Sequence, residues 1–563
     1  MRKLVLAQIL FLCLLPTVAE AAKHWAKSNQ GMVATVHPLA TDAGVAALRK
    51  GGNALDAAIA AALTLGVVDG HNSGLGGGCF VLIHRPDGKV IAIDGREMAP
   101  RRSTRDMFLK NGKPTPQASQ VGALASGVPG SVLAYEYSLA RFGRLKLADL
   151  LIPAAKIAER GFKIDRNFAQ RLARHSQVLA RFSASRAQFL DSSGKAWKAG
   201  HRLKLPDLAR TYREIARHGS KWFYLGEFAE RTANWMKDHG GIIDKKDFAS
   251  YLIKVRKPIR STYRGYEILG FPPPSSGGIH VAQILNILEA FDLAKINRES
   301  PTRFHHVVTE ALKRAFADRA HWLGDADFAK VPRGLINKNY ARRLSRQIDL
   351  KRATVVARYG TPPRAKENVF GRHTTHIAAA DKFGNWVAIT ATVNTSFGSK
   401  VVIPGTGVVM NNQMDDFSIN PGVPNAFGLI GGEANAIAPG KRPLSSMSPT
   451  IVLKNGNPVL TVGAAGGPRI ITIAATTIVR VVDLKMSLAD AIAAPRFHHQ
   501  WVPDTLFCSR DFPDAVFNGL RKMGHKVKCR KYNGIAQAIG VDAKGRFIGI
   551  HDPRVPGKAA GPR

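Results

Sequence analysis

The spacing of apolar residues near the start of the chain predicts two helices. Thr41 or Asp42 can cap the first helix, which is expected to end at Gly51-Gly52. Residues 54–65 form the second helix, and their side chains are apolar on nearly all sides. Because such a helix has no polar face to turn toward water, we expect it to pack tightly against a sheet.

Three further segments place apolar runs on both sides of turn residues, as paired strands do. The predicted pairs are 80–84 with 90–94, 374–380 with 386–393, and 451–453 with 459–462. Residues 140–350 instead have helical periodicity and are expected to be mainly helical. No internal repeat or low-complexity linker divides the chain. We therefore expect one intertwined α/β unit in which layered sheets are flanked by helices.

Composition places the chain among enzyme-sized globular proteins. It has 563 residues, of which 45% are hydrophobic and 22% are charged. This excludes a disordered, collagen-like or disulfide-dense protein. At roughly 150 residues per domain the length alone suggests three or four domains. The absence of linkers favours the single unit.

The chain is strongly basic, with a formal net charge of +40 that is spread over its whole length. The densest basic stretches, 245–264 and 521–531, are interrupted by apolar or acidic residues and lack the stacked aromatic residues of a single-strand binding groove. We interpret them as solvated surface and predict no nucleic-acid partner. A non-enzymatic, polyanion-binding envelope protein stays open as an alternative.

The N-terminus has the three-part layout of a secretory signal. Arg2 and Lys3 precede an apolar run over residues 4–16, and Ala19-Glu20-Ala21 offers a cleavage site after Ala21. The run is too short to span a bilayer comfortably, and no later stretch reaches that length. The pattern predicts a signal peptide over 1–21 and a periplasmic or secreted protein without a transmembrane segment.

Three of the four cysteines remain once the signal containing Cys13 is removed. Cys508 and Cys529 could pair in an oxidising compartment, although the sequence gives no distance between them. Cys79 lies in an apolar run after three glycines. We interpret it as a small core residue and not as a nucleophile.

Most familiar catalytic signatures are absent from the sequence. There is no Gly-x-Ser-x-Gly, His-Glu-x-x-His, Cys-x-x-Cys or phosphate-binding Walker loop. Residues 74–79 come near the dinucleotide-binding fingerprint but lack its last glycine and precede a strand. Dinucleotide binding is therefore not expected.

Polar and conformationally demanding segments gather after His373. Gly466-Gly467 follows a predicted strand. Such a turn can point backbone N–H groups at an anion, as an oxyanion hole requires. It can equally be only a tight turn. The other segments are Thr374-Thr375-His376, 394–398, 411–416 and 445–449.

These segments, in this order, resemble the γ-glutamyltranspeptidase family of N-terminal-nucleophile hydrolases. The resemblance runs from about Ala34 to Asp552-Pro553-Arg554 and includes 94–100, 127–130, 421–425 and 495–500. It implies a four-layer αββα sandwich in which a large and a small subunit remain intertwined after self-cleavage. It implies no metal or organic cofactor.

The resemblance also implies how the chain matures and reacts. The precursor would cleave itself between His373 and Thr374, giving a large subunit, 22–373, and a small catalytic subunit, 374–563, which form a heterodimer. The freed α-amino group of Thr374 can act as the base for its own hydroxyl, since a threonine hydroxyl is a poor nucleophile unaided. Thr392 would orient that hydroxyl, and Gly466 and Gly467 would form the oxyanion hole.

The implied substrate carries an α-carboxylate and an α-ammonium group. Arg96, Ser445 and Ser446 would hold the carboxylate, and Asn394, Gln413 and Asp416 the ammonium. Asp416 distinguishes γ-glutamyl enzymes from glutaryl acylases, because a glutaryl substrate has no α-ammonium group for this carboxylate to bind. The expected partners are glutathione and other γ-glutamyl compounds, with water, amino acids or dipeptides as acceptors. A glutaryl or β-lactam acylase on the same scaffold is the enzymatic alternative.

One departure from the family pattern concerns the segment 421–432, which resembles the lid of the active site. Several bacterial members have a tyrosine where this chain has Phe427. Phenylalanine keeps the ring that can cover the site but has no hydroxyl to bond a residue such as Asn394. We expect looser closure and a larger share of hydrolysis.

Overall fold

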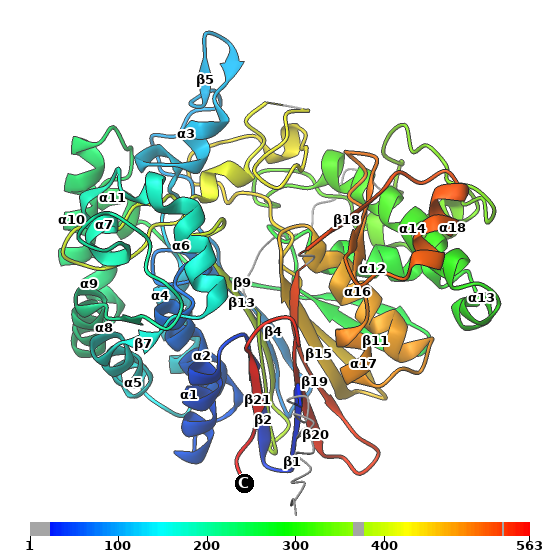
Figure 1. Ribbon diagram of the computed structural model, residues 1–563, viewed down its shortest axis with the longest axis horizontal. Coiled ribbons are helices and arrows are strands. Elements are labelled where there is room, and N and C mark those ends of the chain that lie inside the picture. The colour runs from blue at the N-terminus through cyan, green and yellow to red at the C-terminus, as the bar shows by residue number, and fades with distance from the viewer. Residues whose placement is uncertain (1–22, 364–375, 421, 532–533) are drawn as a thin grey trace, which may run out of the picture.

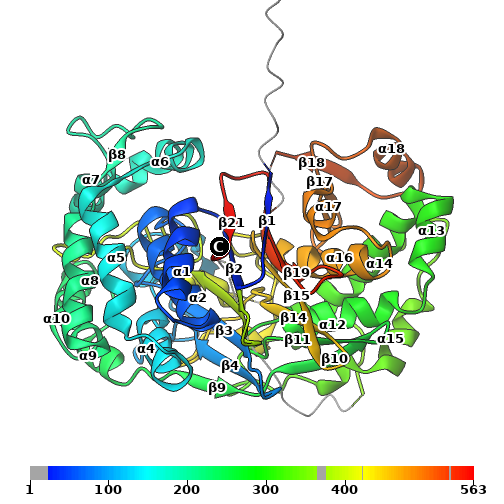
Figure 2. The same ribbon diagram turned by 90° about the horizontal axis from the view of Figure 1, so that it is seen from below.

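Two antiparallel sheets stacked face to face form the centre of the molecule, as a computed structural model shows (Figures 1 and 2). The structure describes residues 23–363, 376–420, 422–531 and 534–563. The first sheet, the β12 sheet, runs in the order β21 (Lys558–Ala560), β2 (Gly31–Thr35), β12 (His376–Asp381), β13 (Trp386–Thr392), β3 (Gly78–His84), β4 (Val90–Gly95) and β9 (Lys254–Arg256). The second, the β15 sheet, runs in the order β1 (Trp25–Ser28), β20 (Phe547–His551), β19 (Ile535–Val541), β15 (Asn457–Ala465), β14 (Thr450–Lys454), β11 (Tyr266–Gly270) and β10 (Ile259–Tyr263).

Helices cover the outer face of each sheet (Figure 2). The β12 sheet is covered by α1 (Pro38–Arg49), α2 (Ala54–Val68) and α4 (Ser131–Phe142), with α5 (Leu147–Arg160), α6 (Arg166–Leu179), α7 (Ser183–Phe189), α8 (Pro206–His218), α9 (Ser220–Tyr224), α10 (Glu227–Asp238) and α11 (Lys245–Ala249) further out. The β15 sheet is covered by α12 (Gly277–Leu288), α16 (Arg469–Val482) and α17 (Leu488–Ala493), with α13 (Leu293–Glu299), α14 (Pro301–Trp322), α15 (Lys338–Ser345) and α18 (Asp514–Lys522) beyond them.

Apolar side chains fill the space between the two sheets. Phe80 of β3 stacks on Phe271, just after β11, with ring centroids 4.1 Å apart. Ala378 and Ala388 from the β12 sheet and Ile451 from the β15 sheet are fully buried in the same cluster. Small residues on one sheet opposite large ones on the other let the layers pack closely. The four-layer αββα prediction is therefore confirmed.

The first two predicted helices are present, with different boundaries. The first helix begins at Pro38 and not at Thr41 or Asp42, so that prediction was wrong by about one turn. His37 is the cap, and its ring nitrogen accepts a bond from the Leu39 backbone N–H at 3.2 Å. Proline at the first helical position fits this start. The second helix is α2, which is buried along its whole length.

The middle of the chain is mainly helical, as predicted, but besides the short pair β7–β8 it contributes three strands to the two large sheets that the periodicity did not indicate. These are β9 and β10, each at the edge of a sheet, and β11, which lies between β10 and β14. The basic stretch 245–264 runs through two of them. In β10 Ile259 and Tyr263 are buried while Arg260 is exposed, so the stretch is solvated on one side only.

The predicted hairpins are confirmed as β3–β4, β12–β13 and β14–β15. Thr374 and Thr375, placed at the start of the second hairpin, lie outside the described residues. Short elements complete the chain: β5 (Leu109–Lys110), β6 (Lys113–Pro114), α3 (Pro116–Gln120), β7 (Phe162–Lys163), β8 (Arg202–Leu203), β16 (Phe497–His498), β17 (Leu506–Ser509) and β18 (Val527–Arg530).

The structure joins Cys508 and Cys529 in a disulfide between the neighbouring parallel strands β17 and β18. The sequence left this pairing open. Cys79 is free and fully buried in β3, and burial raises the pKa of its thiol far above the usual range. The prediction that Cys79 is a core residue is confirmed. No helix of the described part of the chain is long and apolar enough to cross a membrane.

Strands from both sides of position 373 alternate within each sheet. In one sheet β12 and β13 lie between β2 and β3, and in the other β20, β19, β15 and β14 lie between β1 and β11. The first and last strands of the described chain also lie together: the Ser28 hydroxyl donates to the Pro562 carbonyl at 2.9 Å, and β21 pairs with β2. The segments before and after position 373 thus form one interleaved structure.

Candidate active site

Polar segments converge where β12 begins and β13 ends. His376 pairs with Thr390, and a Cβ at Gly463 of β15 would collide with the His376 ring. The ends of the two central strands therefore face the end of β15 across the sandwich. The segments that follow β4, β13 and β15 carry the predicted site residues to this region.

Arg96 and Asp416 form the charged centre of the site. They are fully or almost fully buried and are paired at 2.8 Å. Gln413 donates to the same Asp416 oxygen at 2.7 Å, and Glu97 accepts from Arg96 at 3.0 Å. The cation predicted for the substrate carboxylate and the anion predicted for the substrate ammonium thus bind each other here. A substrate with both charges offers each of them a new partner of the correct sign.

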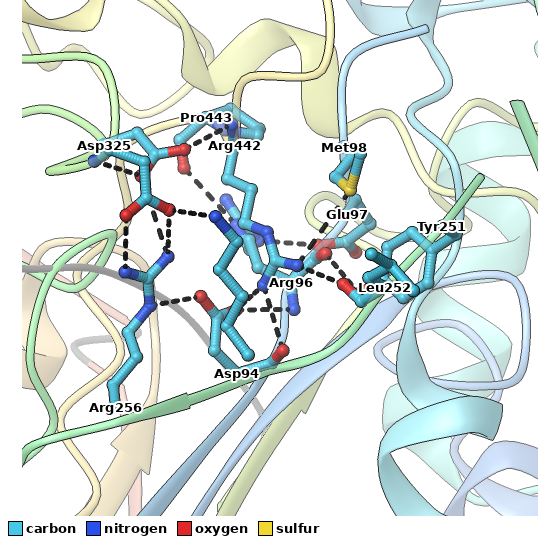
Figure 3. Close-up of polar contacts among 12 residues, drawn as sticks. Asp94, Arg96, Glu97, Met98, Tyr251, Leu252, Arg256, Asp325, Arg442 and Pro443 are labelled. Atoms are coloured by element: carbon cyan, nitrogen blue, oxygen red, sulfur yellow. Dashed lines mark hydrogen bonds and ion pairs between the residues drawn. The ribbon is translucent and has the colours of Figure 1, made fainter.

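A second layer of ion pairs fixes the backbone that carries Arg96 (Figure 3). Asp94 accepts from the Arg96 backbone N–H at 2.9 Å and is paired with Arg256 at 2.7 Å and with Arg442 at 2.5 Å. The two arginines hold the pKa of Asp94 below its usual range despite its complete burial. Tyr251 donates to the Arg96 carbonyl at 2.7 Å. Such support limits the freedom of the guanidinium group.

Ser445 and Ser446 are fully buried next to a fourth arginine, Arg319 of α14. Arg319 donates to the Ser446 hydroxyl at 3.2 Å and to the Ser276 hydroxyl at 3.1 Å. Burial lowers the pKa of Arg319 to about 10, and the Asp416 charge opposes this shift. Among the described residues the Ser445 hydroxyl has no hydrogen-bond partner. These groups offer a carboxylate both hydroxyl donors and a nearby positive charge.

Thr392 and Asn394 lie at the end of β13. The Asn394 backbone N–H donates to the Thr392 hydroxyl at 2.7 Å, and Asn394 has a φ of 79°. Asparagine tolerates this left-handed conformation better than most residues. Its side-chain amide donates to the Asn412 carbonyl at 2.9 Å. The turn is therefore locked, and it places the Thr392 hydroxyl at the strand end.

Gly466 and Gly467 leave β15 with φ values of 140° and 61°. Residues with side chains rarely adopt such values, so this turn requires glycine. α16 begins two residues later, and the N-terminus of a helix adds positive potential near an anion. The turn can therefore present N–H groups to a developing oxyanion.

Phe427 covers this glycine turn. A Cβ added at Gly467 would lie 2.6 Å from the ring of Phe427. Asp415 accepts from the Ala426 backbone N–H at 2.9 Å, and Gln500 donates to the Gly428 carbonyl at 2.9 Å. The segment around Phe427 is thus held from both sides over the site.

Two residues of the site were missed by reasoning from the sequence. Glu97 pairs with Arg96, and burial raises the pKa of its carboxyl to about 7. Its adjacency to Arg96 was the only available signal. Arg319 lies in a long helix among many other basic residues, where nothing in the sequence distinguishes it. His373 and Thr374 lie outside the described residues.

One group of described side chains away from this site has the chemistry of metal ligands: His306, Glu310 and His525. Glu310 is already paired with Lys313 and Arg314, both at 2.7 Å. Those cations would repel a metal ion, and His306 and His525 are hydrogen-bonded to each other at 2.7 Å. The group is therefore explained as an internal polar network.

Stacked antiparallel sheets between helical layers, with the polar site at the strand ends, define the N-terminal-nucleophile hydrolase fold. The solved structure of cephalosporin acylase from Bacillus halodurans superposes with a TM-score of 0.85 at 28% identity, over 96% of this chain and 97% of that one. The sequence pattern of the Gamma-glutamyltranspeptidase family matches residues 40–562. The chain belongs to this family.

Curated relatives extend over nearly the whole chain. The glutathione hydrolase proenzyme of Escherichia coli (strain K12) is 44% identical over 95% of this chain and 92% of its own. The Acylase ACY 1 proenzyme of Pseudomonas sp. (strain SE83) is 38% identical over 95% and 94%. Because both kinds of relative align throughout, the choice between the two activities depends on the residues of the site.

Phe427→Tyr is expected to shift the products from hydrolysis toward transfer. A tyrosine hydroxyl adds a polar group where the lid covers the glycine turn, and tighter closure excludes water from the acyl-enzyme. We expect the ratio of transfer to hydrolysis to rise about 2- to 5-fold, as for one modest hydrogen bond. The measurement is the product ratio at a fixed concentration of acceptor dipeptide. An unchanged ratio would show that the hydroxyl has no part in closure.

Proposed function

We propose that this protein is an exported γ-glutamyltransferase and glutathione hydrolase that matures by cutting itself between His373 and Thr374. The chain matches the family throughout, and its 44% identical relative is named a glutathione hydrolase proenzyme. The term proenzyme supports a precursor cut into the subunits 22–373 and 374–563. The signal pattern over residues 1–21 supports a periplasmic or secreted location.

Thr374 is the proposed nucleophile. Position 374 precedes His376, the first residue of β12, by two residues, and β12 begins near the ends of β13 and β15. The α-amino group of Thr374, with an ordinary pKa of about 8, takes the hydroxyl proton as the oxygen attacks the γ-glutamyl carbonyl carbon. The carbonyl oxygen becomes an oxyanion, which the Gly466 and Gly467 N–H groups stabilise.

The two halves of the reaction then balance. When the C–N bond of the amide breaks, the protonated α-amino group of Thr374 gives its proton to the leaving amine. A γ-glutamyl ester then remains on Thr374. Water or the amine of an acceptor attacks this ester and gives up its proton to the α-amino group of Thr374. As the ester C–O bond breaks, that proton passes to the Thr374 oxygen and restores its hydroxyl. Glutamate is released in the first case and a new γ-glutamyl amide in the second.

The buried Asp416 is the observation that carries the choice of substrate. An uncompensated carboxylate is costly in the interior, and here Asp416 is held by Arg96 and Gln413 at the centre of the site. An α-ammonium group is the ligand that this anion suits. A glutaryl group would bring only a carboxylate and leave Asp416 to repel it. The acylase activity named for other relatives is therefore the second candidate.

The test compares release of aniline from a γ-glutamyl anilide and from its glutaryl analogue, which differ only in the α-ammonium group. We expect kcat/KM to favour the γ-glutamyl compound by at least about 30-fold, since loss of one partner of a buried charge pair costs about 2–5 kcal/mol. A preference for the glutaryl compound would place the protein with the acylases. Turnover of neither compound would favour the polyanion-binding alternative.

A further inference from the structure

A pocket of about 350 Å³ opens beside the candidate active site, and it is separate from the groups that would hold the γ-glutamyl moiety. None of Arg96, Asn394, Gln413, Asp416, Ser445 and Ser446 lines it. We call it the basic pocket. Its size falls within the range of about 300–1,000 Å³ that small-molecule sites occupy. Its lining comes from residues 36–37, 68–72, 162–174, 465, 531, 535 and 554–556, with gaps inside these ranges.

The basic pocket touches the reaction centre at three points. Ala465 lines it and directly precedes Gly466. Asn72 lines it and accepts from the Val393 backbone N–H, next to Thr392, at 3.0 Å. Val36 lines it and directly follows β2. Because β2 is antiparallel to β12 and Ala34 lies opposite Ala378, the end of β2 lies beside the start of β12. The pocket therefore lies against the strand ends and the glycine turn.

The pocket presents cations whose charge is available to a ligand. Among the described residues, Lys163, Arg174 and Lys531 line the pocket and have no carboxylate partner. Lys163 ends β7, Arg174 lies in α6, and Lys531 follows β18. The pocket is thus bordered by positive charge from both halves of the molecule.

The other charged groups that face the pocket are already engaged. Arg171 donates to the Ser396 hydroxyl at 2.5 Å, and Arg554 is paired with Asp552 at 3.1 Å. Asp165 caps α6 by accepting from the Phe168 N–H at 2.7 Å. Asp69 accepts from Asn72 at 3.0 Å, and burial raises its pKa to about 7, which reduces its negative charge. The Nδ1 atom of buried His71, which lines the pocket, has no hydrogen-bond partner in the described part of the chain.

We infer that the basic pocket binds the part of the substrate beyond the scissile amide, and that Arg174, Lys163 and Lys531 take its free carboxylate. The inference rests on the proposed function. The two substituents of a planar trans amide point away from each other, so a γ-glutamyl group held on Arg96 and Asp416 directs the rest of the donor away from these two residues. The basic pocket does not include them and borders the glycine turn at Ala465. The leaving dipeptide of glutathione and an incoming amino acid or dipeptide all carry such a carboxylate.

The test measures how strongly the enzyme prefers an acceptor with a carboxylate over the same acceptor as an amide. With a γ-glutamyl anilide as donor, kcat/KM is determined for glycylglycine and for glycylglycinamide. We expect the wild-type protein to prefer the acid by about 10-fold, as charge-assisted hydrogen bonds imply. In Arg174→Gln/Lys531→Gln the ratio should fall below about 3-fold, because most of the exposed positive charge is then removed. Because the ratio is taken within one protein, a general loss of activity cancels.

The matched control is Lys246→Gln in α11, which removes an exposed lysine that does not line the pocket. It should keep the wild-type ratio, and added salt should reduce the ratio in the wild-type protein because the charges are exposed. Equal use of acid and amide by the wild-type protein would overturn the inference while leaving the proposed function intact. A wild-type ratio in the double variant would do the same. Failure to turn over the anilide at all would overturn both.

Discussion

Thr374→Ala is expected to give a chain that stays uncut and has lost γ-glutamyl transfer and hydrolysis. Without the hydroxyl there is no nucleophile to attack either the bond after His373 or the substrate carbonyl. Removal of a catalytic nucleophile costs several orders of magnitude, so kcat should fall at least about 1,000-fold. A denaturing gel should show one chain in place of fragments of 352 and 190 residues, the lengths of 22–373 and 374–563.

The chain offers a matched control in the next residue. Thr375→Ala removes the same group one position later and should still be cut, with Thr374 as the new N-terminal residue in a mass measurement. Thr374→Ser should keep part of the activity, because serine retains a hydroxyl group. Cutting of Thr374→Ala together with an uncut Thr375→Ala would move the nucleophile to position 375. Circular dichroism of each variant would separate a loss of chemistry from a loss of fold.

Asp416→Asn is expected to remove the preference for γ-glutamyl substrates. The change leaves the size of the side chain intact but takes away the anion that pairs with Arg96 at 2.8 Å. Truncating one member of a buried charge pair costs about 2–5 kcal/mol, so kcat/KM for the γ-glutamyl anilide should fall at least about 30-fold. The glutaryl anilide should lose much less, because it has no ammonium group.

Asp415→Asn is the matched control for this change. Asp415 is also buried, but it bonds Ser119 at 2.7 Å and the Ala426 backbone, and it does not pair with Arg96. Its effect should therefore be similar on both anilides. If Asp416→Asn also lowered both rates by the same factor, Asp416 would have only a structural part in the site. Thermal unfolding of both variants would measure that part directly.

The sequence predicted the layered fold well because its strongest signals are local. The apolar run 54–65 predicts a helix, and Asn455-Gly456 between 451–453 and 459–462 predicts a hairpin turn, each from a few neighbouring residues. By contrast, β10 alternates buried Ile259 and Tyr263 with charged residues in a basic stretch, so its composition resembles solvated surface. The start of α1 was misplaced because His37, an uncommon cap, precedes two better capping residues.

The site was predictable only where the family pattern supplied it. Arg96, Asp416 and Gln413 come together from segments about 320 residues apart, and no local rule brings them into contact. Arg319 shows the limit of such patterns: it is one of several basic residues in its helix, and only tertiary packing places it beside Ser446. The cations of the basic pocket were likewise hidden in a uniformly basic composition.

The contact between Ser28 and Pro562, beside β1, β2 and β21, permits a rearranged gene. A linker from residue 563 to residue 23 would join two segments that are in contact through Ser28 and Pro562. The reading frame could then begin at Thr374 and end at His373, with every strand pair of the two sheets retained. Removal of the initiator methionine would expose the threonine amine directly. Such a circular permutant would separate two reactions that the proposal assigns to Thr374: reaction with the substrate and cleavage of the precursor. The permutant could carry out the first without the second.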